Sequence, residues 1–222
     1  MNNCQVLLSI KNLSICTDSL ELLKDYNLEL NAGEWKGISA PTGTGKTTLF
    51  NYIAGILPPN TFKITGELKK AEGLKIAYAF QEPRLIPSIN VLQNIMLPLK
   101  NIIDKESAAS NAQMWLEKFN LLNKAYEFPN KLSGGEQQRA NLARAFAYSA
   151  VRFALPESKQ AVPEHVEGLL LLDEPFASQD EENALNIKKL INEQIQLPQT
   201  AALVISHDKS MLQQICSQVY EL

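Results

Sequence analysis

The feature that most limits the possible folds is a short loop containing two glycines. Residues 40–47 have the sequence Ala-Pro-Thr-Gly-Thr-Gly-Lys-Thr. A strand-like segment, residues 34–39, precedes the loop, and residues 47–56 have the apolar spacing of a helix. In such a strand–loop–helix unit, glycines allow backbone N–H groups to converge on phosphate oxygens, and the positive end of the helix adds to the same site. The loop therefore predicts a phosphate-binding site in an α/β fold.

Individual side chains of this loop have expected roles. Lys46 is expected to reach the β- and γ-phosphates, Thr47 to ligate magnesium (Mg2+), and Thr48 to hydrogen-bond the α-phosphate. The loop departs from the pattern G-x-x-x-x-G-K-[ST] because Ala40 occupies the first glycine position, where a methyl group is tolerated if φ is negative. An ordinary glycine turn before a helix is the alternative. The predicted phosphate-binding residues are Ala40, Pro41, Thr42, Gly43, Thr44, Gly45, Lys46, Thr47 and Thr48.

An acidic pair follows an aliphatic run near the other end of the chain. Residues 169–172 are four leucines, and Asp173 and Glu174 come directly after them. Such a run is typical of a parallel strand buried on both faces, and ligands of open parallel sheets bind at the carboxyl ends of the strands. We expect Asp173 to hold Mg2+ and Glu174 to act as a general base, an effect worth about 10²–10⁴ in rate. Two acids in a solvated loop are the alternative, which the four leucines disfavour.

A second glycine-containing turn occupies residues 132–136, Leu-Ser-Gly-Gly-Glu. Ser133 and Glu136 have the spacing of a capping box at the start of a helix. The two intervening glycines weaken a helix by about 1 kcal/mol each relative to alanine. That cost is understandable if a group such as a phosphate approaches the backbone closely at this helix N-terminus. Both interpretations can hold together.

Strand-like segments alternate with helix-like ones, which indicates a parallel sheet. We expect an α/β core of about residues 1–85 and 151–222, into which a helical subdomain of about residues 86–150 is inserted. Strands are expected at residues 5–10, 26–30, 34–39, 75–80, 169–172 and 201–206.

The helical pattern begins at about residue 90. Asp104 is expected to cap one helix, and a second helix is expected from Ser133 to about Ser149.

Composition limits the functional classes. The 222 residues have a net charge of −3, so no broad nucleic-acid-binding face is expected. No run approaches the roughly 20 apolar residues that span a bilayer, and the N-terminus does not have the pattern of a signal peptide. The three cysteines form no CxxC pair, and their odd number favours a reducing cytosol. Any membrane role therefore requires a separate partner.

Two motifs together resemble those of the nucleotide-binding subunits of ABC transporters. They are Leu-Ser-Gly-Gly-Glu-Gln-Gln-Arg at residues 132–139 and Leu-Leu-Leu-Leu-Asp-Glu-Pro at residues 169–175. The resemblance covers essentially the whole chain, from residue 12 to residue 208. It implies a P-loop NTPase (RecA-like) parallel-sheet core with an antiparallel β subdomain and an inserted α-helical subdomain. It also implies ATP and Mg2+ as cofactors, and hydrolysis in a head-to-tail dimer.

The resemblance also assigns roles to particular residues. Gln81 looks like the glutamine that touches Mg2+ and the attacking water, and His207 looks like the histidine that hydrogen-bonds the γ-phosphate. Asp180 looks like an aspartate that crosses the dimer interface. Residues 133–136 are expected to meet the nucleotide of the opposite copy. The candidate catalytic residues are Glu174, His207 and Gln81; the candidate metal ligands are Thr47, Gln81 and Asp173; the candidate nucleotide contacts beyond the loop are Ser133, Gly134, Gly135, Glu136 and Asp180.

The chain departs from the family pattern at three further places. Thr17 aligns with an aromatic residue that stacks on adenine in the family, and threonine cannot stack. Residues 156–168 form a longer connection than usual, which we interpret as a polar surface loop. Gln179 occupies a position where leucine is common.

Residues 79–87 look like the nitrate/sulfonate/taurine branch of importer ATPases. This resemblance implies import of a small anion or organic solute. The implied partners are transmembrane permease subunits, a second copy of the chain and an extracytoplasmic solute-binding protein, with no nucleic acid. The implied location is cytoplasmic, peripheral on the inner face of the cell membrane through the permease.

Three alternatives remain open. Lipoprotein-export and macrolide-type cassettes are near neighbours in sequence. A soluble cassette that serves DNA repair, iron–sulfur assembly or the ribosome is the second. The third is a degenerate nucleotide sensor, which Ala40 and Thr17 motivate and which the retention of Lys46, Glu174 and His207 disfavours.

Overall fold

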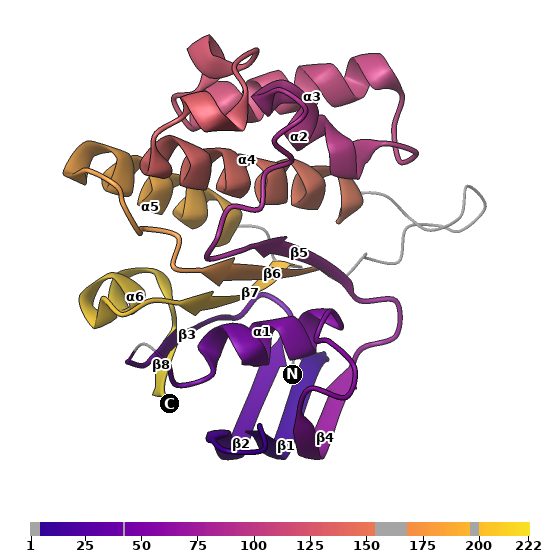
Figure 1. Cartoon of the computed structure of the whole chain (residues 1–222), viewed down its shortest axis with the longest axis vertical. Coiled ribbons are helices and arrows are strands. Elements are labelled where there is room, and N and C mark those ends of the chain that lie inside the picture. Colours follow the sequence, from indigo (N-terminus) through magenta and orange to yellow (C-terminus); the bar gives the residue numbers. More distant parts are fainter. Residues whose placement is uncertain (1–4, 42, 154–167, 196–199) are drawn as a thin grey trace.

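Two sheets and the helices packed against them make up the described part of the chain (Figure 1). The computed structural model describes residues 5–41, 43–153, 168–195 and 200–222. Predictions for Thr42 and for residues 156–167 fall outside these ranges.

The larger sheet is parallel and has the strand order β5-β6-β7-β3-β8. Strand β6, which lies between β5 and β7, is buried along its whole length, as the four leucines predict. Alternate leucines face opposite sides: Leu169 and Leu171 belong to one hydrophobic cluster, and Leu170 and Leu172 to another. The strands are β3 (Trp35–Ser39), β5 (Lys75–Ala79), β6 (Gly168–Asp173), β7 (Thr200–Ile205) and β8 (Gln218–Glu221).

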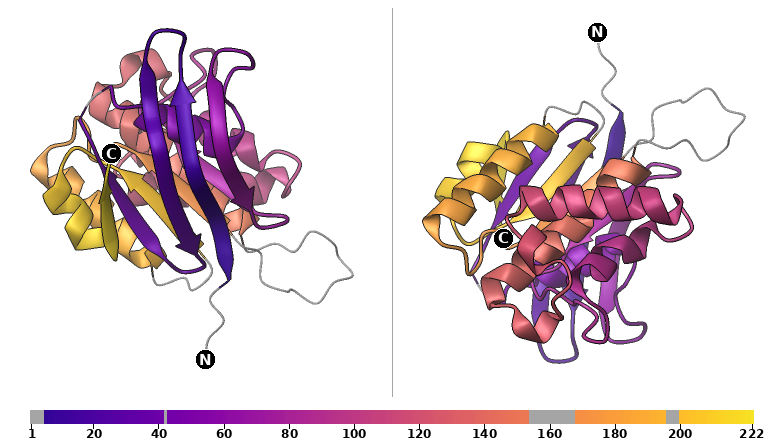
Figure 2. Two further views of the ribbon diagram at one scale, coloured as in Figure 1. Left: turned by 90° about the horizontal axis from the view of Figure 1, so that it is seen from below. Right: turned by 90° about the horizontal axis from the view of Figure 1, so that it is seen from above.

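The smaller sheet is antiparallel, with β1 (Val6–Cys16) between β2 (Glu21–Asn31) and β4 (Lys63–Lys70). Helix α1 (Lys46–Ala54) lies between the two sheets (Figure 1), and it contributes Leu49, Phe50 and Ile53 to the cluster that they share. Figure 2 shows the antiparallel sheet in its view from below. The two sheets therefore hold the N-terminus of α1 at a fixed position, because its apolar side is fully buried.

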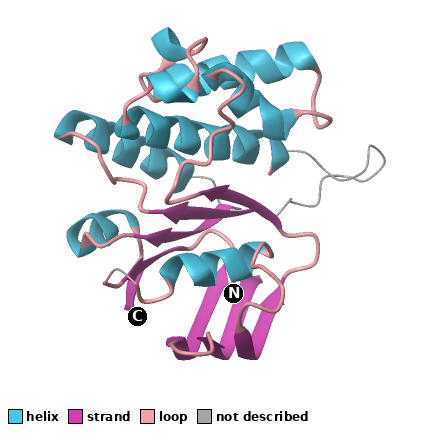
Figure 3. Cartoon of the chain, in the orientation of Figure 1, coloured by secondary structure: helices cyan, strands magenta, loops and turns pink. Residues whose placement is uncertain are grey.

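The remaining helices pack on the opposite face of the parallel sheet (Figure 3). An aromatic group of Trp115, Phe119 and Phe146 joins α3 to α4. None of the described helices combines the length and the apolar composition that crossing a membrane requires. The helices are α2 (Val91–Met96), α3 (Lys105–Lys118), α4 (Gly134–Arg152), α5 (Glu181–Ile195) and α6 (Lys209–Ile215), with 3-10 turns η1 (Leu97–Leu99), η2 (Leu122–Lys124) and η3 (Pro129–Lys131).

The expected helix starts are found. Asp104 caps α3 by accepting a hydrogen bond from the Ser107 N–H at 2.9 Å. Ser133 caps α4, which continues three residues beyond the predicted end and stops at Arg152. Fold class and layers agree with prediction, whereas the division into core and inserted subdomain remains an expectation.

Candidate active site

The glycine loop turns the chain from β3 into α1. Gly43 and Gly45 have φ angles of 87° and 83°, in the left-handed region that favours glycine. A Cβ atom at Gly45 would lie 2.8 Å from the carbonyl oxygen of Leu22, so this position also requires glycine for space. Ala40 is buried and is not among the residues with positive φ. Its methyl group is therefore compatible with the loop.

Lys46 opens α1 and is almost entirely buried. Its ammonium donates a hydrogen bond to the Ala40 carbonyl and lies 3.7 Å from Oε1 of Glu174. The loop lysine and the acidic pair that follows β6 therefore meet, as the sequence predicted from segments more than a hundred residues apart.

Thr47 joins three segments through its hydroxyl group. Its Oγ1 donates to Oδ2 of Asp173 at 2.8 Å and lies 3.2 Å from Oε1 of Gln81, which follows β5. Burial raises the pKa of Asp173 to about 6, and its other oxygen, Oδ1, is buried without a hydrogen-bond partner. A buried carboxylate oxygen without a partner is costly unless a cation or water satisfies it. The three oxygen-bearing side chains thus form a set that suits a hard divalent cation.

Glu174 directly follows β6 in a left-handed conformation, with a φ of 50°. Its carboxylate accepts a hydrogen bond from the backbone N–H of His207 at 3.0 Å, and Nδ1 of the same histidine lies 2.9 Å from Oε2. The Glu174 side chain is 9% exposed and that of His207 is 72% exposed. The imidazole therefore orients the carboxylate from the solvent side.

A cavity of about 210 Å³ lies over the loop. Leu22, from β2, lines it, and nothing in the sequence pattern of β2 distinguishes this leucine. Thr17 has another role, because its Oγ1 accepts a hydrogen bond from the Leu20 N–H at 3.0 Å in the β1–β2 connection. The other lining residues are Gly43, Gly45, Lys46, Thr47, Thr48, Gln81 and Glu174.

The second glycine turn lies at the start of α4 and does not line this cavity. The capping box has the expected geometry: the Ser133 hydroxyl accepts from the Glu136 N–H at 3.2 Å, and the Glu136 carboxylate accepts from the Ser133 N–H at 2.8 Å. The hydrogen bond from the Ser133 N–H to the carboxylate lowers the pKa of Glu136. Asp180 precedes α5 and accepts from the Asn183 N–H at 2.8 Å, which lowers its pKa. The contacts that the sequence predicts between this turn, Asp180 and a second copy of the chain remain predictions.

The two glycines of this turn have different surroundings. A Cβ atom at Gly135 would lie 2.5 Å from the carbonyl oxygen of Ser178, whereas one at Gly134 would meet nothing within 4 Å. A close contact within the same chain therefore requires glycine at position 135, which the sequence interpretation missed. Only Gly134 remains open to an approaching group.

Comparison with known proteins agrees with this geometry. Residues 23–154 match the ABC transporter family. The aliphatic sulfonates import ATP-binding protein SsuB 3 of Rhodococcus jostii (strain RHA1) is 35% identical over 187 residues, which span 84% of this chain and 60% of that protein. The lipoprotein-releasing system ATP-binding protein LolD of Buchnera aphidicola subsp. Acyrthosiphon pisum (strain APS) is 30% identical over 209 residues, 87% of this chain and 83% of that protein. A dimeric post-hydrolysis structure of the ATP-binding cassette MJ0796, bound to ADP and Pi, has a TM-score of 0.79 and 25% identity, covering 97% of this chain and 94% of that one.

Fold and site define a P-loop ATPase. The chain belongs to the ABC transporter family, as an ATP-binding and ATP-hydrolysing cassette.

Proposed function

We propose that this chain hydrolyses Mg-ATP as the motor subunit of a membrane importer for a small anion or organic solute. The observation that supports the site assignment best is the contact between Thr47 Oγ1 and Asp173 Oδ2 at 2.8 Å, beside the Lys46–Glu174 pair. Phosphoryl transfer needs mainly positioning and charge neutralisation, and this arrangement supplies both.

Thr47, Asp173 and Gln81 are the residues that would hold Mg2+. They offer a hydroxyl, a buried carboxylate and an amide oxygen, the oxygen ligands that this ion prefers. When bound, the ion neutralises negative charge on the phosphates. Lys46 places a buried positive charge at the same cavity, and Thr48 lines it on the side of α1.

Glu174 is the proposed general base. Its carboxylate lies at the wall of the cavity, and His207 holds it from the solvent side. We also propose that the exposed imidazole of His207 reaches the γ-phosphate, since it lies beside the same carboxylate.

A second copy of the chain is the proposed source of the missing nucleotide contacts. Ser133, Gly134, Gly135, Glu136 and Asp180 do not line the cavity of their own chain, and the related cassette MJ0796 forms a dimer. We propose a head-to-tail pair in which these residues of one copy face the loop of the other. Hydrolysis then depends on dimerisation, because neither copy has a complete site.

Gly134→Ala tests this composite site. The new methyl group meets nothing within 4 Å in the single chain, so the fold should tolerate it or gain about 0.5–1 kcal/mol in the helix. If the other copy's nucleotide approaches this backbone, the ATPase rate should fall about tenfold, equivalent to about 1.4 kcal/mol of lost contact. Phosphate release and thermal unfolding measure the two effects. Full activity in a normally folded variant would rule out a close approach at Gly134.

Gly135→Ala provides the comparison. Its methyl group would meet the Ser178 carbonyl inside the same chain, so this variant should lose stability as well as activity. Only the pair of variants separates contact within the chain from contact between copies.

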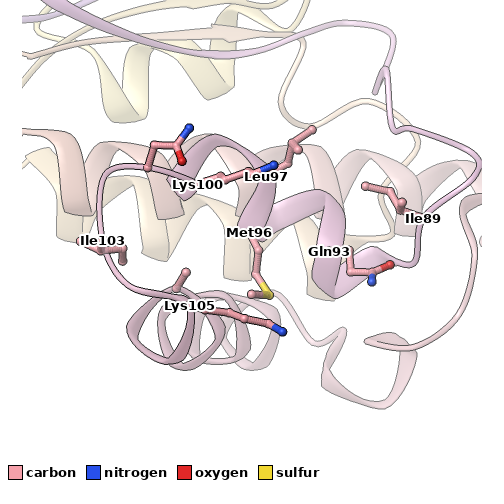
Figure 4. Close-up of a pocket in the computed structure, with 9 residues that line it drawn as sticks. Ile89, Gln93, Met96, Leu97, Lys100, Ile103 and Lys105 are labelled. Carbon is pink, nitrogen blue, oxygen red and sulfur yellow. The ribbon is translucent and has the colours of Figure 1, made fainter.

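The proposed membrane partner is a permease, and a groove in the helical region is the surface we propose for it. The groove has a volume of about 650 Å³ and lies between α2 and the start of α3. In Figure 4 the side chain of Met96 extends from α2 toward Lys105. Leu97, which is 44% exposed, also lines the groove, and Lys100 adds a positive charge to that of Lys105. An apolar segment with acidic ends fits this surface.

Leu97→Glu tests the groove. The basal ATPase rate of the isolated chain should remain within about twofold, since Leu97 does not line the phosphate cavity. Stimulation by the copurified permease should fall at least about tenfold, because the substitution places a charge on an apolar contact. Leu185→Glu, on α5 and 57% exposed, is the matched control. Equal losses in both variants would exclude a specific role for the groove.

The sulfonate-import relative supports an anionic organic solute as the transported molecule. We further propose a solute-binding protein in the same system and a position on the inner face of the cell membrane through the permease. Copurification with a multi-spanning membrane protein, followed by sulfonate uptake in vesicles, tests this assignment. An ATPase that purifies without any membrane protein would favour a soluble cassette instead, and lipoprotein release in place of uptake would favour export.

A further inference from the structure

Two buried amide side chains on α4 contact the backbone beside both candidate catalytic loops. Gln138 is 3% exposed and Asn141 is fully buried. The Asn141 amide donates to the Phe80 carbonyl at 2.7 Å, and the Gln138 amide lies 3.4 Å from the same oxygen and 3.3 Å from the Glu174 carbonyl. We propose that Gln138 and Asn141 are positioning residues that hold Gln81 and Glu174 in place for Mg-ATP hydrolysis, an inference that rests on the function proposed above.

The Phe80 carbonyl is the important acceptor because it belongs to the peptide unit that precedes Gln81. A peptide unit is planar, so fixing this oxygen also fixes the N–H and Cα of Gln81. Gln81 itself is exposed, and within the described residues its side chain has one hydrogen bond, between Oε1 and the Thr47 hydroxyl. The backbone contact is therefore the main restraint on where its amide oxygen lies.

The Glu174 carbonyl needs a restraint for a different reason. Glu174 has a φ of 50°, a conformation that side-chain-bearing residues rarely adopt and that surrounding contacts must maintain. Its backbone N–H donates to the Ile205 carbonyl at 2.9 Å, and its own carbonyl accepts from the Ala177 N–H at 3.1 Å and from Gln138 at 3.3 Å. The turn that aims the carboxylate is thus held on one side by β7 and on the other by α4.

The amide pair is internally complete, which argues against incidental packing. Asn141 uses its second amide hydrogen on Oε1 of Gln138 at 3.2 Å, and its own oxygen accepts from Arg144 at 3.0 Å. Arg144 also donates to the carbonyls of Pro83 and Arg84, at 2.8 and 3.0 Å. Buried polar networks of this kind favour one arrangement strongly, because any other leaves polar groups unpaired. One face of α4 therefore fixes residues 80–84.

The same helix begins at Ser133, the proposed contact with the other copy. A shift of α4 would move the backbone of Phe80 and of Glu174 together. The amide pair thus links the dimer-facing end of α4 to the metal and base positions of its own chain.

Asn94 supplies a matched control, because it contacts the other end of the loop that follows β5 and carries Gln81. It is also fully buried, and its side chain accepts from the Ile86 N–H at 2.7 Å and donates to the Ile86 carbonyl at 3.1 Å. Its burial and bonding resemble those of Asn141, but it holds the loop five residues away from Gln81.

The experiment compares Asn141→Asp with Asn94→Asp in the full chain. Aspartate at 141 keeps the oxygen that accepts from Arg144 but loses the amide that donates to Phe80. With Mn2+ as the probe and a non-hydrolysable ATP analogue, electron paramagnetic resonance should give a metal affinity about tenfold weaker in Asn141→Asp, typical of an orienting residue around a metal. The kcat should fall about tenfold with KM for ATP within about twofold. Asn94→Asp should lose similar thermal stability and keep Mn2+ affinity within about twofold.

Two further variants make every outcome decisive. If Asn141→Asp does not fold, Gln138→Met, which removes the amide and keeps the chain length, should give the same loss of Mn2+ affinity. Equal losses of affinity in the 141 and 94 variants, or none at 141 and 138, would overturn the positioning role. Gln81→Ala separates this inference from the proposed function. If it leaves Mn2+ affinity unchanged, the metal role of Gln81 is wrong; if it weakens the affinity while Asn141→Asp does not, only the positioning inference is wrong.

Discussion

Glu174→Gln is expected to bind Mg-ATP with nearly unchanged affinity and to hydrolyse it about 10²–10⁴ times more slowly. The amide keeps the size of the carboxylate and can still accept the hydrogen bond from the His207 N–H. It cannot take a proton from water, and it also removes the negative charge 3.7 Å from Lys46. Single-turnover phosphate release gives the rate, and binding of a fluorescent ATP analogue gives the affinity.

The control is Glu67→Gln, the same chemical change at an exposed position on β4. It should leave both quantities within about twofold of the original chain, as surface substitutions remote from a site usually do. Unchanged turnover in Glu174→Gln would remove this residue from the role of general base. A loss of nucleotide binding as large as the loss of turnover would assign it to substrate binding.

The sequence was sufficient to predict the parts of the site that depend on short, local chemistry. Two glycines, a lysine and a threonine between a strand and a helix predicted the loop, in which both glycines have positive φ. Four consecutive leucines predicted the strand β6, which is buried along its whole length. Because carboxyl ends of parallel strands meet at one edge, Asp173 was expected near the loop, and it contacts Thr47.

Strand lengths in the antiparallel sheet could not be predicted in the same way. The pattern indicated residues 5–10 as a strand, whereas β1 continues to Cys16. Asn12 has a φ of 48° and resembles a turn residue locally, yet Gly66 of β4 lies so close that a Cβ atom there would be 2.3 Å from the Asn12 carbonyl. Pairing on both sides keeps the irregular strand extended, and such long-range pairing leaves no local signal.

The sequence interpretation also missed contacts between side chains and backbone atoms that are far apart in the sequence. Gln138 and Asn141 are three residues apart on a helix whose other buried positions are mostly alanine, leucine and phenylalanine. Two amides on an apolar face are a signal that could have been used, since buried amides need partners. Their partners, the carbonyls of Phe80 and Glu174, are backbone atoms, and no residue type in the sequence indicates them.

Asp173→Asn is expected to make the isolated chain more stable while it loses Mg2+-dependent nucleotide binding. Burial raises the pKa of Asp173 from 3.8 to about 6, so at pH 7 the folded chain holds a charge that its surroundings disfavour. The difference corresponds to about 3 kcal/mol at most, at 1.36 kcal/mol per pKa unit. Asparagine still accepts from Thr47 and carries no charge. Urea unfolding at pH 7 should therefore give a gain of about 1–3 kcal/mol.

The pH dependence has a definite sign. A carboxyl group whose pKa is raised on folding favours the folded chain at low pH, and this contribution disappears as the pH rises through the folded value. The stability gap between the variant and the original chain should thus open between about pH 4 and about pH 6 and then stay constant. A gap that is constant over this range, or a variant that is less stable at pH 7, would contradict the cost assigned to the buried carboxylate.

Mg-ATP should reverse the order of stability. A ligand that binds only the folded chain stabilises it by about 4.1 kcal/mol at one thousand times its dissociation constant, which exceeds the expected gain of the variant. The original chain gains this amount, but Asp173→Asn does not, because it has lost the carboxylate that we propose as a metal ligand. Unfolding with ATP alone is the control, since Lys46 and the loop N–H groups remain in both chains. If Mg-ATP stabilises both chains equally, Asp173 does not hold the ion. If the order of stability of the two chains reverses only when Mg2+ is present, the buried carboxylate destabilises the chain and the bound metal offsets this cost.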